Sequence, residues 1–417
     1  MERGNPIEHL RYFIVPDVKP EIITSIEVGT EWILFRDKFR FEATYYTSDN
    51  ENQILSLALP QSSGYESKLI NAGLVSSRGV ELSVGSTVFS NNDFSWDVDF
   101  NYTFNRTRIE ELAEGIEFIN FWTDAKGGAY TWVGEDIGNI YDQKLLTVED
   151  PKSEYYGWPI LDGSGSWNYL GGINNLVKIG NYNPDFTIGM STGLRYKNFR
   201  LNAVLDWRQG GDFVSQTYRY AESDFSTQRQ LDNTINPQKI DGNIADYLKA
   251  NADKIIVNNT PVVGGPIPAW GGYEIVYDGL PVGSGTFNPG VIAEYDDNGN
   301  LVRYIENLGE EGTQYIPMAD NYPWDFTKAA TFDASFIKLR EISLSYTLPS
   351  SWTQSVKMDN LMLSLYSRNI ILWTAADIGI DPERAFQPEG SGFKQGIERY
   401  NVTPFVLPIG IRLSANF

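Results

Sequence analysis

The chain has 417 residues, a formal net charge of −21, no cysteine and one histidine, His9. The lack of cysteine excludes a disulfide scaffold and Cys-ligated zinc, and a lone His9 is more simply a loop residue than a catalytic or metal-binding one. The acidic balance, without clustered basic residues to meet phosphates, argues against nucleic acid as a partner.

Hydropathy places two further limits on the chain. No apolar run approaches the ~18–20 residues that a membrane-spanning helix needs. The first residues, MERGNPIEHL, lack the apolar segment of a signal peptide. We therefore expect either a soluble protein or a chain that does not begin at its biological start.

The first predicted elements form a hairpin. Apolar and polar residues alternate from Thr24 to Leu34, the triplet Arg-Asp-Lys at 36–38 makes a turn, and alternation resumes at Phe39. The same period-2 pattern then recurs along the chain. Nine strands are predicted, at 24–35, 39–46, 80–88, 94–104, 186–194, 199–207, 336–348, 361–373 and 405–417.

Three of these strands carry irregularities. Lys338 and Arg340 fall on the apolar phase of 336–348, so this end either projects beyond the lipid or is bulged. The pattern of 361–373 is mostly apolar and predicts a bulge. Pro408 lies on the inward phase of 405–417, an unusual position within a strand.

The stretch FSWDVDFNYTF, 94–104, shows the alternation most strictly. Its even positions are large and apolar, and its odd positions are small or polar. A soluble β-sandwich would turn the apolar face to a core, whereas a transmembrane barrel would turn it to lipid. This strand alone does not decide between them.

Strand length and the connections favour the barrel. Strands of 9–13 residues exceed the soluble average of about five or six and match tilted membrane strands. Short and long connections also alternate, as periplasmic turns and extracellular loops do. The short ones are 36–38, 90–93, 197–198 and 349–360, and the long ones are 49–79, 106–184, 209–335 and 374–404.

One long connection contains a hairpin of its own. The stretch 291–305 is interpreted as two short strands around an Asn298–Gly299 turn. A calcium-binding EF-hand-like loop is the alternative, but the ligand spacing and the terminal Glu are missing.

An odd number of antiparallel strands cannot close into a barrel, because the first and last strands would meet parallel. Open sheet edges are not tolerated in lipid. We therefore expect 1–417 to be the C-terminal portion of a larger barrel, with the N-terminal strands supplied by another chain or by sequence outside this one.

Several segments carry a family resemblance. They include PDVKPEIITSIEVGTEW, NYNPDFTIGMSTGLRYKNFRLN, SFIKLREISLSYTLPSSW and LMLSLYSRNIILWT. The chain resembles the C-terminal half of the SusC-like TonB-dependent outer-membrane transporters of Bacteroidetes. The resemblance implies an all-β, 22-stranded antiparallel transmembrane barrel with long extracellular loops, and an importer of glycans or peptides that works with a SusD-like surface lipoprotein and with TonB.

Parts of that family pattern are missing from this chain. The plug domain and the TonB box are absent, so TonB would act through a plug outside 1–417. The loop 142–168 departs from the family's Gly- and Asp-rich stretch. The family has no catalytic residues, so neither enzymatic activity nor a cofactor is expected; outer-membrane lipid is the expected surrounding, and nucleic acid is not a partner.

Three sets of residues are singled out as functional candidates. The candidate lumen-facing residues are Glu27, Glu31, Arg40, Glu42, Glu81, Asp97, Asp99, Asn101, Arg195, Arg200 and Asp206. The candidate loop aromatics for substrate or lid contact, which small loop cores would explain equally simply, are Trp122, Trp132, Trp158, Trp167, Trp270 and Trp324. Phe417, an aromatic last residue on an alternating strand, resembles an outer-membrane assembly signal.

Three functions are weighed. The first is part of a nutrient importer, and the second is a SusC-like barrel that serves as a scaffold in a larger outer-membrane complex. A plug with a TonB box would distinguish them. The third, a soluble glycoside hydrolase with paired carboxylates, has no distinguishing motif and conflicts with the strand lengths and the loop alternation.

Overall fold

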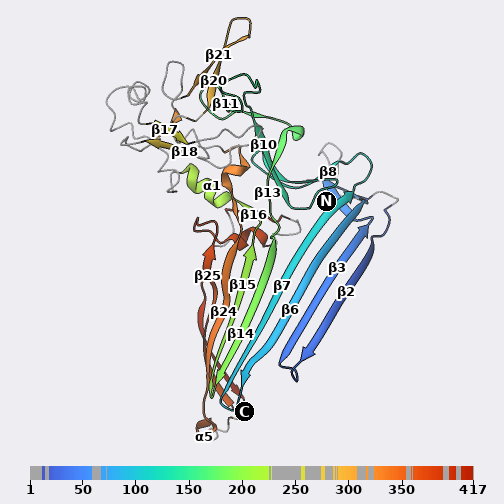
Figure 1. Cartoon of the computed structure of the whole chain (residues 1–417), viewed down its shortest axis with the longest axis vertical. Coiled ribbons are helices and arrows are strands. Elements are labelled where there is room, and N and C mark those ends of the chain that lie inside the picture. The colour runs from blue at the N-terminus through green and yellow to red at the C-terminus, as the bar shows by residue number, and fades with distance from the viewer. Residues whose placement is uncertain are drawn as a thin grey trace, which may run out of the picture.

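The fold is known from a computed structural model (Figure 1). The structure describes residues 12–14, 18–58, 67–71, 73–224, 227, 255–258, 274–277, 285–286, 288, 290–307, 316–317, 324–353, 358, 360–387, 394–400 and 405–416. Phe417 and Trp270, both singled out above, lie outside these residues.

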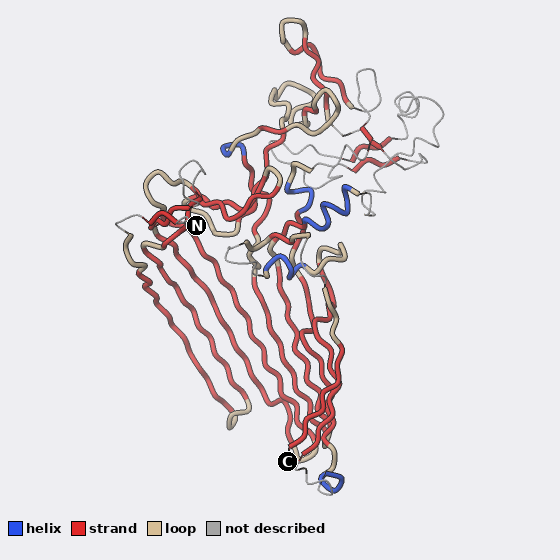
Figure 2. The backbone as a smooth tube through the Cα atoms, turned by 180° about the vertical axis from the view of Figure 1, so that it is seen from behind, coloured by secondary structure: helices blue, strands red, loops and turns tan. Residues whose placement is uncertain are grey.

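One antiparallel sheet of nine long strands dominates the molecule (Figures 1 and 2). Each strand pairs with the next long strand of the chain. In spatial order they are β2 (Ile22–Leu34), β3 (Phe39–Glu51), β6 (Leu74–Ser90), β7 (Phe94–Glu111), β14 (Phe186–Tyr196), β15 (Phe199–Gln209), β24 (Phe336–Thr347), β25 (Asn360–Thr374) and β27 (Ile409–Asn416).

All nine predicted strands are present, and most are longer than the alternation indicated. β6 has 17 residues and β7 has 18. The last strand is shorter than predicted, since it begins at Ile409 and not at residue 405. Pro408 explains the difference, because it has no N–H to donate to the ladder. Its carbonyl instead accepts from the Arg368 amide, N···O 3.1 Å.

The connections alternate between short and long, as predicted. Four short connections join β2 to β3, β6 to β7, β14 to β15 and β24 to β25, and the last of these contains α5 (Ser350–Thr353). The long connections gather at the opposite end of the sheet (Figure 2). Among the described residues, β2 pairs only with β3 and β27 only with β25, so both outer edges of the sheet are open.

The predicted bulge in the eighth strand is confirmed. Ile337 pairs with Trp373 and Lys338 with Ile371, so the register skips Leu372. Nearby, Asn369 adopts φ 54°, a left-handed conformation that asparagine tolerates better than most residues.

The long connections form small sheets of their own. Above the wall, β8 (Phe118–Asp124), β9 (Gly127–Trp132), β10 (Asn139–Leu145), β12 (Tyr169–Leu170) and β13 (Leu176–Asn181) make one of these sheets. A second contains β16 (Asp212–Ser215), β23 (Thr331–Asp333) and β26 (Ile397–Glu398), next to α1 (Gln216–Ser223). The remaining elements are β1 (Tyr12–Ile14), β4 (Ile54–Ala58), β5 (Ser67–Asn71), β11 (Ile160–Leu161), η2 (Ile173–Asn175), β17 (Ile255–Asn258), β18 (Glu274–Tyr277), β19 (Gly285–Thr286), β20 (Val291–Tyr295), β21 (Leu301–Glu306), β22 (Ile316–Pro317), η5 (Thr327–Ala330) and η7 (Pro382–Phe386).

The clusters of buried hydrophobic residues lie in these loops and not on the wall. One cluster joins Trp122 of β8, Ile140 of β10 and Val214 of β16 with Tyr182, which follows β13. On the wall, by contrast, large apolar side chains are exposed: Leu344 is 48 % and Leu365 is 55 % exposed. A soluble sandwich would bury such a face, so the exposed side chains favour contact with lipid.

The hairpin predicted at 291–305 is confirmed. β20 and β21 pair antiparallel, and Figure 1 shows them far from the nine-stranded sheet. At the turn, the Asp296 carboxylate accepts hydrogen bonds from the amides of Asn298 and Asn300. Across the residues that the structure describes, no helix is long and apolar enough to cross a bilayer.

Candidate functional site

The register places all the candidate lumen residues on one face of the sheet. Side chains paired across antiparallel strands point to the same face. Glu31 pairs with Glu42, Glu42 with Ser83, and Ser83 with Asn101, and the chain of partners continues across the sheet. The same pairing connects Asp97 with Gly193, and Arg195 with Arg200. We call this surface the polar face; that it lines a lumen stays a prediction.

The polar face is divided by charge. Strands β2, β3, β6 and β7 carry most of its carboxylates, with Arg40 as their one basic residue among the candidates, and Asp206 of β15 and Glu341 of β24 lie on the same face. The other five strands of the sheet, β14, β15, β24, β25 and β27, carry most of the cations. The acidic set is Glu27, Glu31, Glu42, Glu81, Asp97 and Asp99, and the basic set is Arg195, Arg200, Lys338, Arg340, Arg368 and Arg412. A ligand beside this face would therefore meet a negative half and a positive half.

The opposite face carries apolar side chains with aromatic clusters toward both ends. Near the short turns, the Phe199 and Tyr346 rings are in tilted contact, with centroids 4.7 Å apart. Toward the loops, Phe186 contacts both Tyr102 and Trp207, with centroids 5.5 and 5.4 Å apart. Two aromatic belts that flank an apolar band are typical of transmembrane strands, because amphipathic rings prefer the membrane interfaces.

Lys338 and Arg340 reach the polar side through a bulge, which decides between the two interpretations of their position. β15 pairs Val204 with Glu341 and Leu205 with Leu339, so Arg340 is skipped. The extra residue changes the phase of the strand. Lys338 consequently pairs with Asp206 of the polar face instead of pointing outward.

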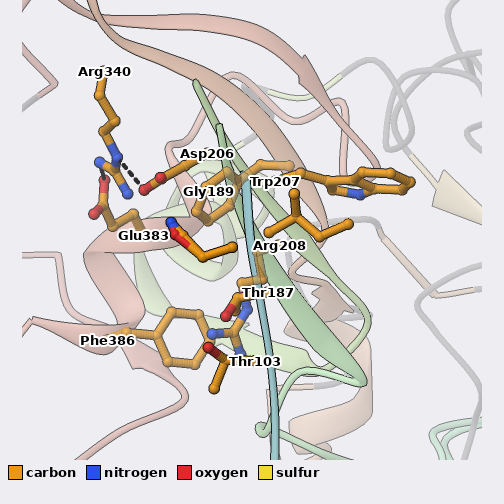
Figure 3. Close-up of a pocket in the computed structure, with 12 residues that line it drawn as sticks. Thr103, Thr187, Gly189, Asp206, Trp207, Arg208, Arg340, Glu383 and Phe386 are labelled. Atoms are coloured by element: carbon orange, nitrogen blue, oxygen red, sulfur yellow. Dashed lines mark hydrogen bonds and ion pairs between the residues drawn. The ribbon is translucent and has the colours of Figure 1, made fainter. Parts of the chain in front are cut away.

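These two cations hold a loop against the wall. Lys338 Nζ lies 2.6 Å from Asp381 Oδ2 and 2.6 Å from Glu383 Oε2, and the lysine is completely buried. The Arg340 guanidinium lies between two carboxylates: its Nε is 2.5 Å from Asp206 Oδ2, and its Nη1 is 2.6 Å from Glu383 Oε2 (Figure 3). Burial alone would raise the pKa of Glu383, but the hydrogen bonds from Arg340 and Lys338 outweigh it and hold that pKa below its ordinary value.

A hollow of about 380 Å³ lies beside this network, at the loop end of the polar face. Asn101, Thr103 and Thr187 line one side of it. Phe386 of η7 also lines it and lies under the Arg208 guanidinium, 3.8 Å from ring centroid to carbon (Figure 3). This lining could hold a polar solute or a protein loop, because it combines neutral hydrogen-bonding groups with an aromatic ring and an ion-pair network. None of the lining side chains is arranged as a nucleophile or a general acid–base pair.

The loop tryptophans differ in their surroundings. Trp122 is 4 % exposed and donates to the Gln395 carbonyl, N···O 2.8 Å, so it belongs to a loop core. Trp132 packs edge-on against Tyr141, with centroids 4.6 Å apart. Trp167 packs against a second buried cluster, whereas Trp324 is 37 % exposed. Trp158 lies edge-on to a neighbouring tyrosine, 5.6 Å between centroids.

Sequence reasoning missed two buried charge clusters in the loops. Arg219 of α1 lies 2.5 Å from Asp124, and both side chains are 2 % exposed. Glu398 is fully buried and accepts from Ser215 Oγ and Thr217 Oγ1, while Arg384 lies 3.1 Å away. Their partners are up to 183 residues apart in the sequence, so no local pattern could have revealed them.

Neither cluster resembles a metal centre. The described residues contain no group of three or more His, Asp or Glu side chains that could hold a metal ion. The buried loop carboxylates instead have arginine, hydroxyl or backbone amide partners, which is how folded proteins usually stabilise a buried charge.

Asp142 gives the loops a pH dependence. Burial raises its pKa from 3.8 to about 6, although the amides of Gln143 and Lys328 donate to the carboxylate. Because the pKa of Asp142 is higher in the folded than in the unfolded protein, protonation of Asp142 stabilises the fold. This stabilisation is complete at a pH below the unfolded-state pKa and is lost as the pH rises through about 6.

We therefore expect the backbone amides of β10 to exchange hydrogen with solvent more readily at pH 7 than at pH 4.5, after correction for intrinsic exchange rates. Asp142→Asn should remove this dependence, and an unchanged pH slope in that variant would contradict the assignment.

Comparisons with known proteins agree with this architecture. The family described as "TonB dependent receptor-like, beta-barrel" matches residues 4–253. The TonB-dependent receptor P3 of Formosa agariphila is 28 % identical over 228 residues, which cover 49 % of this chain and 22 % of the relative. The TonB-dependent receptor SusC of Bacteroides thetaiotaomicron is 19 % identical over 238 residues, 52 % of this chain and 23 % of SusC.

The solved structures show the same fold. The structure of the RagAB peptide transporter matches with a TM-score of 0.53 at 17 % identity, covering 88 % of this chain and 33 % of that one. The chain therefore spans about a fifth of the length of these curated relatives and a third of the structural one. Since the family match covers more than half of the chain, the chain belongs to the TonB-dependent receptor-like β-barrel family and, like its SusC-type relatives, is an outer-membrane protein.

Proposed function

We propose that the chain forms part of the wall and the extracellular loops of a SusC-like, TonB-dependent importer. The observation that carries this proposal is the nine-stranded antiparallel sheet, whose polar face is continuous in register and whose apolar face is exposed. A strand wall of this kind separates lipid from an aqueous lumen. The solutes we propose are glycans or peptides; the RagAB relative is described as a peptide transporter.

The open edges of the sheet support a larger barrel. The outward backbone groups of β2 and β27 have no strand partner among the described residues. In a bilayer each unpaired backbone group costs several kcal/mol, so both edges require further strands. We propose that the rest of a 22-stranded wall and a plug come from sequence outside 1–417. TonB would then act through that plug.

A SusD-like surface lipoprotein is the proposed partner at the loop end. The loops there are extensive and carry exposed aromatic side chains, with Trp324 at 37 % and Tyr400 at 61 % exposure. Aromatic rings that are partly exposed are typical of interface anchors. The second candidate function, a scaffold for other outer-membrane proteins, would use the same loops without import, and the size of the loop sheets above the wall is the observation that favours it.

Uptake by living cells distinguishes the two functions. We expect a bacterium that lacks the full-length gene to lose growth on at least one glycan or peptide source, because the import route is gone. Reintroducing the gene should restore growth, and a protonophore or the loss of TonB should abolish uptake again.

The matched measurement is affinity purification of the full-length protein from outer membranes. Co-purification of a lipoprotein together with the growth defect supports the importer. Unchanged growth and uptake on every source, together with loss of other outer-membrane proteins from a complex, would establish the scaffold instead.

A further inference from the structure

A second, smaller hollow opens on the basic half of the polar face. Its volume is about 170 Å³, and it lies between β15, β24, β25 and β27. Arg200 and Arg412 line it together with hydroxyl groups, and the remaining lining includes Tyr366. The serines that contribute are Ser343, Ser345 and Ser364.

The register explains why the two arginines share this hollow. Arg200 pairs with Ser345, Ser345 with Ser364, and Ser364 with Arg412, so the four residues form one row across four strands. The row spans three strand spacings, about 14 Å between its outer Cα atoms. The serine hydroxyls are 2.8 Å apart, with Ser345 6 % and Ser364 7 % exposed. Two long cations therefore flank a floor of two buried hydroxyls.

The cations of this hollow have no carboxylate partner of their own. Within the described part of the chain, neither Arg200 nor Arg412 forms an ion pair. One carboxylate, Glu341, also lines the hollow, but Arg368 Nε already lies 2.7 Å from its Oε2. With Arg368 counted, three cations face one anion here.

Tyr366 contributes to the position of two of these cations. The Arg368 and Arg412 guanidinium carbons lie 5.2 and 5.6 Å from its ring centroid. Contact with an aromatic ring orients a guanidinium and reduces its freedom. Gly410 makes room for this ring, since a Cβ there would lie 2.6 Å from the tyrosine oxygen.

We propose that this hollow binds a carboxylate or sulfate group. Planar guanidinium groups match the oxygens of such anions and donate two hydrogen bonds each, while serine hydroxyls can donate more. The proposal rests on the proposed function, in that the anion belongs to a solute in a water-filled lumen. It favours acidic glycans, or peptides with free carboxylates, over neutral sugars at this point of the wall.

Arginine modification tests the site directly. Full-length protein in native outer-membrane vesicles is treated with p-hydroxyphenylglyoxal, and the modification of each arginine is followed by peptide mass spectrometry. Sodium sulfate is the probe, and sodium chloride at the same ionic strength and glucose are the controls. At about ten times its dissociation constant, sulfate should slow modification of Arg200 and Arg412 roughly tenfold, because only the free fraction reacts.

Two variants sharpen the test. Arg412→Gln should abolish the protection of Arg200 by sulfate, because the anion loses one of its two guanidinium contacts. Arg195→Gln is the matched control, since Arg195 is the register partner of Arg200 but does not line the hollow. In this control variant, protection of Arg200 should persist.

Three outcomes overturn the proposal. If Arg200 and Arg412 react at the same rate with and without sulfate, the hollow does not bind anions. If they are unreactive without sulfate while Arg40, 64 % exposed in its side chain, reacts, an acidic segment of the protein fills the hollow and no solute binds there. If Arg40 and Arg195 are unreactive as well, the polar face is not in water, and the proposed function fails together with the site.

Discussion

Replacing Val98 by arginine is expected to lower the free energy of unfolding of the full-length protein by about 2–4 kcal/mol. Val98 lies in β7 on the apolar face, between Ser86 and Thr192 in the register. If this face contacts lipid near the midplane, a cation there must be buried in hydrocarbon or drawn to the interface. Urea unfolding in lipid vesicles, followed by the loss of heat-modifiable migration, measures the change.

The matched control is Asn101→Arg on the same strand. Asn101 belongs to the polar face and is exposed, so a cation there should be tolerated with a change below about 1 kcal/mol. Equal destabilisation by both variants, or a larger effect at Asn101, would contradict the assignment of the two faces.

Lys338→Met should destabilise the protein by about 3–5 kcal/mol, because it removes one partner from a buried charge network. Lys338 is fully buried, and Asp381, which is 7 % exposed, would lose its cation. The loop containing η7 should then detach from the wall. Limited proteolysis around 382–400, together with urea unfolding, reports both effects.

A surface pair provides the comparison. Arg368 lies 2.7 Å from Glu341, but their side chains are 46 % and 36 % exposed. Solvent screens such a pair, so Arg368→Gln should cost less than about 1 kcal/mol. A Lys338→Met effect as small as that of Arg368→Gln would show that the η7 network does not anchor the loop.

The nine-stranded wall could be predicted from the sequence because each strand has one apolar and one polar face. Two faces of different polarity impose a period of two, which FSWDVDFNYTF displays without exception. Since each strand pairs with the next long strand, the order of the sheet also followed from the chain order. The split between short turns and long loops followed from the distances between the patterned segments.

The rest depends on contacts that no local pattern encodes. The alternation showed Lys338 and Arg340 out of phase, but only the pairing with β15 revealed the bulge that moves them inward. The Arg219–Asp124 pair joins two residues that are 95 positions apart in the sequence. The hollow between Arg200 and Arg412 needs the register of four strands, and alternation within one strand cannot supply that register.

Cysteine accessibility tests the central claim most directly, because residues 1–417 contain no cysteine that would react in the background. Single cysteines replace Asn101 and Phe100 in the full-length protein, with Ser83 and Val84 as a second pair in register with them. In intact outer membranes, a charged, membrane-impermeant thiol reagent should label Asn101→Cys and Ser83→Cys. Phe100→Cys and Val84→Cys should react only with a lipid-soluble reagent. The reverse pattern, or equal labelling of all four by the charged reagent, would contradict a wall with lipid on one face and an aqueous lumen on the other.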